Sequence, residues 1–246
     1  MRIAILETGR INAEIADRFA RYPDMFRAMF DAAPNQGNHQ HGMDFIEVPV
    51  VDGVIPDDVD DYDGYLVTGS AAGVYDDFDW IGPLMAFLRD AHAADKPLVG
   101  ICFGHQVIAH ALGGRTENWH DGWGLGVYDI AVSDRPTWMP DTDTVSLIHI
   151  HQDQVTKLPE DATPIGSTSF CANAMFHIGD NVFCMQGHPE FTADYTGALM
   201  ETRRSTMGPE RVDAAMKSLE GGHQGLDMAD WIITFFQQHA AARAAA

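Results

Sequence analysis

Two short stretches of the chain carry residue types that can perform covalent chemistry. The first places Cys102 between Gly100 and Gly104, after an apolar run over residues 98–101 and before an apolar helical pattern that ends at Gly113. This order predicts a buried strand, a tight turn and a helix, with the cysteine at the turn, as in a nucleophile elbow. Flanking glycines permit a strained backbone, and a helix N-terminus favours a thiolate. The alternative for Cys102 is a free cysteine buried beside a core strand.

The second stretch is the tripeptide that contains His188 and Glu190, separated by Pro189. The proline restricts His188 to extended backbone, in which side chains two residues apart point to the same side. We therefore expect the imidazole and the carboxylate to lie together where a predicted strand ends. Reacting groups gather at the carboxyl ends of strands in parallel α/β sheets, so we expect His188 to lie near Cys102. A polar cap for the strand is the alternative.

Together these residue types supply the parts of an acyl-transfer site. His188 would take the proton of Cys102 and deliver it to a leaving amine, and Glu190 would fix the tautomer of the imidazole. The oxyanion of a tetrahedral intermediate also needs N–H donors, one of which comes from the residue after an elbow nucleophile. The donors that we expect are the main-chain amides of an oxyanion hole at Phe103, Gly69 and Ser70.

The hydrophobic pattern predicts the elements that would hold these groups. Up to residue 114 it follows the order β-α-β-β-α-β-α, which is typical of a parallel sheet with helices on both faces. Strands are expected over residues 3–6, 45–50, 64–68 and 98–101, and helices over 23–30, 80–88 and 103–112. Residues 13–19 are a candidate helical turn. Residues 35–42 are a predicted loop, whose His39 and His41 lack a neighbouring carboxylate or cysteine, so we expect no metal site there.

The hydrophobic pattern changes after residue 114. Residues 115–186 carry short apolar runs between turn residues, and the last run is expected to return to the main sheet. The predicted strands cover residues 124–132, 145–150, 164–167, 174–178 and 182–186. From residue 192 the pattern is helical, and the expected helices cover residues 192–206, 209–219 and 226–239, followed by a frayed alanine-rich end.

Composition limits the classes of partner. The net charge of −21 comes from 36 acidic and 15 basic residues, and such a surface repels phosphate backbones and anionic lipids, so we expect neither nucleic acid nor membrane as a partner. Three cysteines without a CxxC pair predict no disulfide framework and no zinc ribbon. We expect no cofactor and no metal. The first residues do not have the pattern of a signal peptide, which predicts a cytoplasmic protein.

Residues 100–106 (Gly-Ile-Cys-Phe-Gly-His-Gln) and 186–190 (Gln-Gly-His-Pro-Glu) resemble the motifs of class I glutamine amidotransferases. Residues 68–70 and 149–155 also fit, and the resemblance covers residues 1–192. It implies a flavodoxin-like three-layer α/β sandwich with a central, mainly parallel sheet, a β-rich insertion and a C-terminal helical extension. We accordingly expect a single domain over residues 1–246, with a core over 1–192 and an extension over 193–246.

The resemblance also implies an activity, which is hydrolysis of a γ-glutamyl amide through a γ-glutamyl thioester on Cys102. The substrate, a small γ-glutamyl molecule such as glutamine, would bind at Gln106 and at the backbone of Ile150 and His151. Many relatives have Ser-His-Gly-Asp at this last segment, whereas Ile150 and Gln152 stand here in place of the small residues. His151 itself is either a pocket residue or a buried core histidine.

Several functions stay open at the level of the sequence. The chain has no ATP-pyrophosphatase or Walker-type phosphate loop, which favours a stand-alone hydrolase similar to the plant γ-glutamyl peptidases and to the amidotransferase part of guanylate synthetase. A second possibility is a glutaminase subunit that delivers ammonia to a separate synthase chain. A third is a non-catalytic binding or regulatory module with the same fold. A serine-hydrolase-like fold is disfavoured because there the acid precedes the histidine in the chain.

Overall fold

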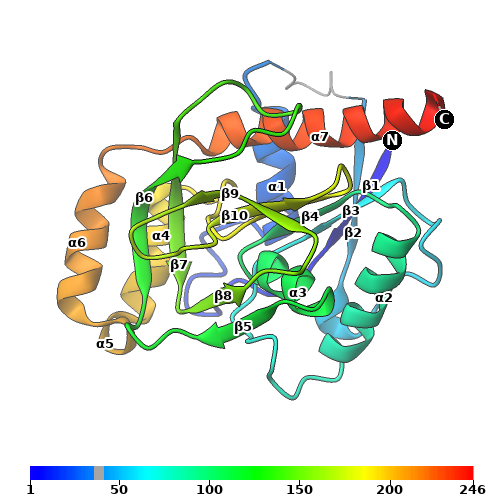
Figure 1. The fold of residues 1–246 in the computed structure, drawn as a ribbon. Helices are drawn as coiled ribbons and strands as arrows, with labels where there is room; N and C mark the ends of the chain where they lie inside the picture. The colour runs from blue at the N-terminus through cyan, green and yellow to red at the C-terminus, as the bar shows by residue number, and fades with distance from the viewer. Residues whose placement is uncertain (36–41, 246) are drawn as a thin grey trace.

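The computed structural model of the chain describes residues 1–35 and 42–245. A nine-stranded sheet lies at its centre, and a small two-stranded sheet lies beside one end of it (Figure 1). The histidine-containing loop predicted over residues 35–42 falls mostly outside the described residues.

One half of the large sheet is parallel. Its five strands are, in spatial order, β2 (Asp44–Val48), β1 (Arg2–Leu6), β3 (Gly64–Val67), β4 (Leu98–Ile101) and β11 (Val182–Met185). Strand β11 pairs with β4 in parallel register, which confirms that the last strand of the β-rich section returns to the main sheet. The carboxyl ends of β3, β4 and β11 therefore meet at one edge.

The other half of the sheet is antiparallel and continues from β11. Its strands are β10 (Met175–Ile178), β9 (Ala162–Ser167), β6 (Gly124–Val132) and β7 (Thr144–His151). The small second sheet pairs β5 (Arg115–Asn118) with β8 (Asp153–Lys157) in antiparallel register. The sequence did not predict β5 and β8, because both strands are short and mostly polar and lack the apolar run that marks a buried strand.

Helices cover the two faces of the parallel half. On one face, α2 (Ile81–Ala93) and α3 (Phe103–Ala111) bury Leu84, Phe87 and Val107 in one apolar cluster with the sheet. On the other, α1 (Tyr22–Asp31) and the long α7 (Gly225–Ala245) share a second cluster. Figure 1 shows α7 along one side of the sheet, and α2 and α3 on the opposite side. The three-layer α/β architecture predicted from the sequence is thus confirmed.

Three further helices pack beside the antiparallel half. They are α4 (Ala193–Thr202), α5 (Arg204–Met207) and α6 (Pro209–Leu219), and they bury a third apolar cluster with β6 and β7. Residues 13–19 form turns, with main-chain hydrogen bonds from Ile15 to Asn12 and from Arg18 to Ile15. One local expectation was wrong, because the alanine-rich end continues α7 as a helix to Ala245. The second strand is also shorter than predicted, because a 3₁₀ turn begins at Val50.

Candidate active site

Cys102 occupies the turn between β4 and α3, as the sequence predicts. Its backbone has φ 53° and ψ −101°, a conformation that is costly for any residue with a Cβ. Among the described residues, only Asp95 and Cys102 combine a side chain with a positive φ. Backbone strain of this kind persists where the surrounding structure enforces it, and such residues cluster at functional sites. The residue is 5% exposed, so Cys102 is nearly enclosed at the N-terminus of α3.

The two flanking glycines are needed for close packing of this turn. A Cβ on Gly100 would lie 2.6 Å from the carbonyl oxygen of Gly104. A Cβ on Gly104 would collide with the carbonyl oxygen of Val67, in the neighbouring strand β3. Because both obstacles are backbone atoms, neither can move aside cheaply. The glycines therefore allow α3 to start directly against the strands that position Cys102.

His188 is held beside Cys102 by three contacts. Its Nδ1 lies 2.8 Å from Oε1 of Glu190, and both side chains are buried. Its ring stacks on that of Phe191, with ring centroids 3.9 Å apart and an interplanar angle of 5°. Its main-chain amide donates to the carbonyl of Ile148 at 2.7 Å. The imidazole is thus fixed in position and orientation, and its other nitrogen is left to hydrogen-bond Cys102.

The electrostatics of this pair favour a protonated imidazole. Burial by itself lowers the pKa of His188. The negative charges of Glu190 and of a Cys102 thiolate, and the hydrogen bonds to both groups, raise this pKa by more than burial lowers it. The pKa of His188 is consequently raised from 6.5 to about 10. An imidazolium next to a sulfur stabilises the thiolate form, which is the nucleophilic form of a cysteine.

The predicted oxyanion donors lie around the same sulfur. A Cβ on Gly69 would be 3.7 Å from Cβ of Cys102 and 2.8 Å from Cε1 of His188, so only a glycine fits there without displacing the imidazole. Within the described part of the chain, the amides of Ser70 and Phe103 donate no hydrogen bond to another residue. They are therefore available to a substrate oxygen.

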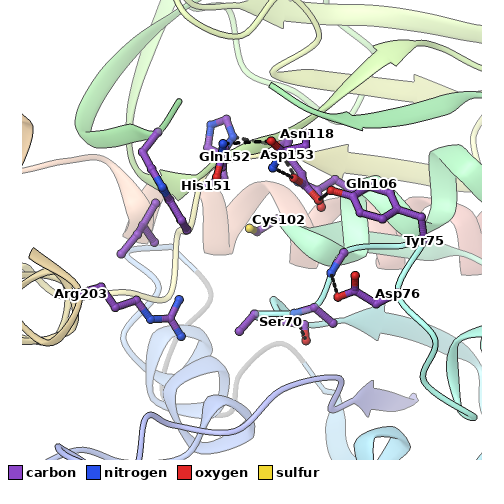
Figure 2. A pocket seen from close by; sticks show the side chains of 15 residues that line it. Ser70, Tyr75, Asp76, Cys102, Gln106, Asn118, His151, Gln152, Asp153 and Arg203 are labelled. Atoms are coloured by element: carbon purple, nitrogen blue, oxygen red, sulfur yellow. Dashed lines mark hydrogen bonds between the residues drawn. The ribbon is translucent and has the colours of Figure 1, made fainter. Parts of the chain in front are cut away.

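A pocket of about 240 Å³ opens at Cys102 (Figure 2). Its floor includes Gln106, whose amide Nε2 donates to the carbonyl of Asp153 at 2.9 Å and to Oε1 of Gln186 at 3.1 Å. Both N–H groups of this side chain are therefore occupied, and its Oε1 is the atom left to accept a hydrogen bond from a ligand. Gln106 thus lies in the lining of the same pocket as Cys102.

His151 and Ile150 line the same pocket from the end of β7. Nδ1 of His151 lies 2.9 Å from the carbonyl of Asp153, and because a carbonyl only accepts, this nitrogen carries the proton. Nε2 then accepts from Nδ1 of His149, 3.2 Å away. Burial lowers the pKa of His151 to about 4, so the ring is neutral at physiological pH. His151 is thus both a buried, hydrogen-bonded histidine and part of the pocket wall.

Sequence reasoning missed the polar residues on the far wall of this pocket. Tyr75 donates its hydroxyl to Oδ2 of Asp153 at 2.8 Å, and Asn118 donates to Oδ1 of the same carboxylate at 2.9 Å. This bridge joins the loop after β3 to the small β5–β8 sheet. Arg203, at the junction of α4 and α5, and Asp76 complete the lining. Asp153 lies in the segment 149–155 that fits the family motifs, but Asn118 and Arg203 belong to no local motif, because their proximity to Cys102 arises only from folding.

Two general properties of the described residues bear on cofactors and membranes. Across residues 1–35 and 42–245, no three His, Cys, Asp or Glu side chains gather as ligands for a metal ion. Over the same ranges, no helix is both long enough and apolar enough to cross a bilayer.

Comparison with known proteins identifies the family. The sequence profile described as "Glutamine amidotransferase class-I" matches residues 43–204, which is more than half of the chain. The chain belongs to the class I glutamine amidotransferase family. Within this family it is 34% identical over 182 residues to gamma-glutamyl peptidase 3 of Arabidopsis thaliana, and the alignment covers 70% of this chain and 73% of that protein.

One further relative by sequence and one solved structure with the same fold extend this comparison. A glutamine-hydrolysing GMP synthase subunit of Halobacterium salinarum is 31% identical over 159 residues, covering 60% of this chain and 77% of that protein. Among solved structures, a glutamine amidotransferase from Thermotoga maritima superposes with a TM-score of 0.71 at 16% identity, covering 97% of both chains. That last similarity supports the amidotransferase fold, whereas the sequence matches carry the family membership.

Proposed function

We propose that this member of the family is a cysteine-dependent hydrolase of γ-glutamyl amides or peptides, acting through a γ-glutamyl thioester on Cys102. The observation that carries the proposal is the cluster formed by the strained Cys102 and the buried His188–Glu190 pair. A catalytic triad consists of a nucleophile, a base beside it and an acid that orients the base, and Cys102, His188 and Glu190 have the residue types for these roles. The identity to a γ-glutamyl peptidase supports the γ-glutamyl substrate.

In the first half of the reaction, the thiolate of Cys102 adds to the γ-carbonyl carbon of the substrate. The carbonyl oxygen becomes an oxyanion, which the free amides of Phe103 and Ser70 are available to stabilise. The carbon–nitrogen bond then breaks, and the leaving nitrogen takes a proton from the His188 imidazolium. The products of this half are a free amine and the γ-glutamyl thioester.

In the second half, a water molecule attacks the thioester. The now neutral His188 accepts the proton of the water, and the carbon–sulfur bond breaks to release glutamate and the Cys102 thiolate. Glu190 stays ionised throughout, and its charge compensates the imidazolium each time it forms. The second step returns the imidazolium–thiolate pair, so the proposed site is ready for another substrate molecule.

The test is hydrolysis by the purified chain alone. Glutamate release from glutamine and from γ-glutamyl peptides should be measured for the wild type, for Cys102→Ala and for Cys171→Ala. Cys171 is a matched control because it is also buried, and burial raises the pKa of its thiol to about 12. Activity should be lost in the first variant and kept in the second. Wild-type protein that releases no glutamate from any of these substrates would contradict the proposal.

A second candidate is a glutaminase subunit that passes ammonia to a separate synthase chain. The specific observation in its favour is the similarity to the GMP synthase chain of Halobacterium salinarum, which is named as one subunit of a larger enzyme. The two candidates differ in what the isolated chain does. Activity that appears only after a synthase is added would favour the subunit, whereas rapid hydrolysis by the lone chain favours the stand-alone enzyme.

A further inference from the structure

Two pockets meet at Cys102, and they differ in their lining. We call the first the acyl pocket, and it is the 240 Å³ pocket that contains Gln106 and Asp153. We call the second the leaving-group pocket. It has a volume of about 40 Å³, adjoins the acyl pocket at Cys102, and is lined by polar and aromatic side chains, among them Arg10, Asn12, Tyr22, His188, Phe191 and Arg203. His188 lines only the second pocket, whereas Arg203 lines both.

The position of His188 decides which pocket takes which half of the substrate. In the proposed reaction, His188 protonates the leaving nitrogen, so that nitrogen must lie within hydrogen-bond reach of the imidazole. Whatever is attached to the nitrogen must then extend into the pocket that His188 lines. The γ-glutamyl half correspondingly occupies the acyl pocket, where Oε1 of Gln106 is free to accept a hydrogen bond from its ammonium group.

Arg203 gives the leaving-group pocket an uncompensated positive charge. Within residues 1–35 and 42–245, its side chain makes no hydrogen bond and no ion pair, although the protein has 36 acidic residues. Its neighbour Arg204 pairs with both Glu201 and Asp213. Figure 2 shows the guanidinium of Arg203 directed toward the space between Cys102 and Ser70.

The other arginine of this pocket does not carry free charge. Arg10 forms ion pairs with the buried Glu7 and with Asp52, so its charge is already balanced inside the protein. Arg203 is therefore the group in this pocket that is free to bind an anion. A guanidinium presents paired N–H donors that match the two oxygens of a carboxylate.

We propose that Arg203 binds the free carboxylate of the leaving group, and that the substrate is accordingly a γ-glutamyl peptide. Ammonia, which leaves from glutamine, has no group for this guanidinium, whereas an amino acid or short peptide that leaves from a γ-glutamyl peptide carries a carboxylate. Arg203 thus determines specificity between peptides and simple amides. This inference rests on the proposed hydrolase function.

The test compares γ-glutamylglycine with γ-glutamylglycinamide, which differ only in that a neutral amide replaces the carboxylate. The measured quantity is the ratio of kcat/KM for the two substrates. Loss of a charge-assisted hydrogen bond changes such a ratio by roughly 10- to 100-fold. Wild-type protein should prefer the carboxylate by that factor, and Arg203→Gln should bring the ratio close to one.

Arg204→Gln is the matched control, because it removes the same charge from the adjacent residue, whose side chain pairs on the surface. This variant should keep the wild-type ratio. Arg203→Lys retains the charge without the planar fork, so its ratio should lie between those of the wild type and Arg203→Gln. It also provides a measurement if the glutamine variant folds poorly.

The outcomes separate this inference from the function on which it rests. A wild-type ratio near one, or an equal loss on both substrates in Arg203→Gln, would overturn the role of Arg203 while leaving γ-glutamyl hydrolysis intact. Equal loss would instead assign Arg203 to the γ-glutamyl half. If the wild type cleaves neither of these two substrates nor glutamine, the proposed hydrolase function is overturned, and this inference is overturned with it.

Discussion

Nδ1 of His188 lies 2.8 Å from Oε1 of Glu190, and the two side chains are both buried although only one residue separates them in the chain. Pro189 between them enforces the extended backbone that turns both side chains to the same side. Because Glu190 occupies Nδ1, only Nε2 of the imidazole is left for Cys102. A single local geometry therefore fixes the tautomer, the orientation and the charge of the proposed base.

Removing the charge of Glu190 should change the pH dependence of the reaction. The carboxylate helps to hold the pKa of His188 at about 10, so the imidazolium that protonates the leaving group persists at neutral pH and is lost as the pH rises through that value. In wild-type protein, kcat/KM should consequently fall on the alkaline side near pH 10. In Glu190→Gln the pKa of His188 falls, and the alkaline limb should move to lower pH.

The measurement is a pH profile of kcat/KM for both proteins, from neutral pH to above the wild-type limb. Glu201→Gln serves as the control, because this carboxylate lies on the surface and pairs with Arg204. Its profile should coincide with that of the wild type. An alkaline limb that stays in place in Glu190→Gln would show that the carboxylate does not set the pKa of His188.

A methyl group at Gly69 should impair catalysis more than folding. The added Cβ would lie 2.8 Å from Cε1 of His188, so the imidazole must shift away from its place beside Cys102. Misplacement of a reacting group by about 1 Å can cost roughly 100-fold in rate. We expect Gly69→Ala to lose kcat/KM on that scale while its thermal unfolding stays close to that of the wild type. Near-normal activity would mean that His188 tolerates displacement.

A methyl group at Gly104 should instead destabilise the fold. Its Cβ would collide with the backbone carbonyl of Val67, and overpacking of this kind costs about 1–3 kcal/mol. Gly82→Ala is the matched control, because this glycine also lies in a helix, α2, and an added Cβ meets nothing within 4 Å. The control should gain about 0.5–1 kcal/mol. Denaturant unfolding of both variants measures the difference, and equal stabilities would contradict the predicted collision.

The parts of the site that the sequence predicts are those encoded locally. The elbow follows from an apolar run, a glycine-flanked Cys102 and a helical pattern, and the His188–Glu190 pair follows from spacing and the proline. That β11 belongs to the main sheet also follows, since buried apolar strands of an α/β chain share one sheet, whereas its place next to β4 is known only from the structure. These features are dictated by neighbours in the chain, so their geometry can be reasoned out without the fold.

The parts that the sequence does not predict depend on long-range packing. Arg203 lies at a helix junction and lines the pockets at Cys102 only because α4, α5 and α6 share an apolar cluster with β6 and β7, and no pattern near residue 203 signals this. Asp153 joins the pocket through β8, a mostly polar strand that periodicity does not detect. The lining residues that come from distant parts of the chain, including the proposed specificity residue Arg203, are thus the ones that sequence reasoning finds last.

The central claim is that Cys102 forms a covalent bond with the acyl group of the substrate. The most direct measurement is mass spectrometry of the protein after reaction with a glutamine-like chloroketone, which alkylates a nucleophile positioned for the γ-carbonyl. We expect one adduct, on the peptide that contains Cys102. Excess glutamine should prevent its formation, and Cys102→Ala should abolish it. An adduct on Cys171 or Cys184, or a fully unmodified Cys102, would contradict the claim.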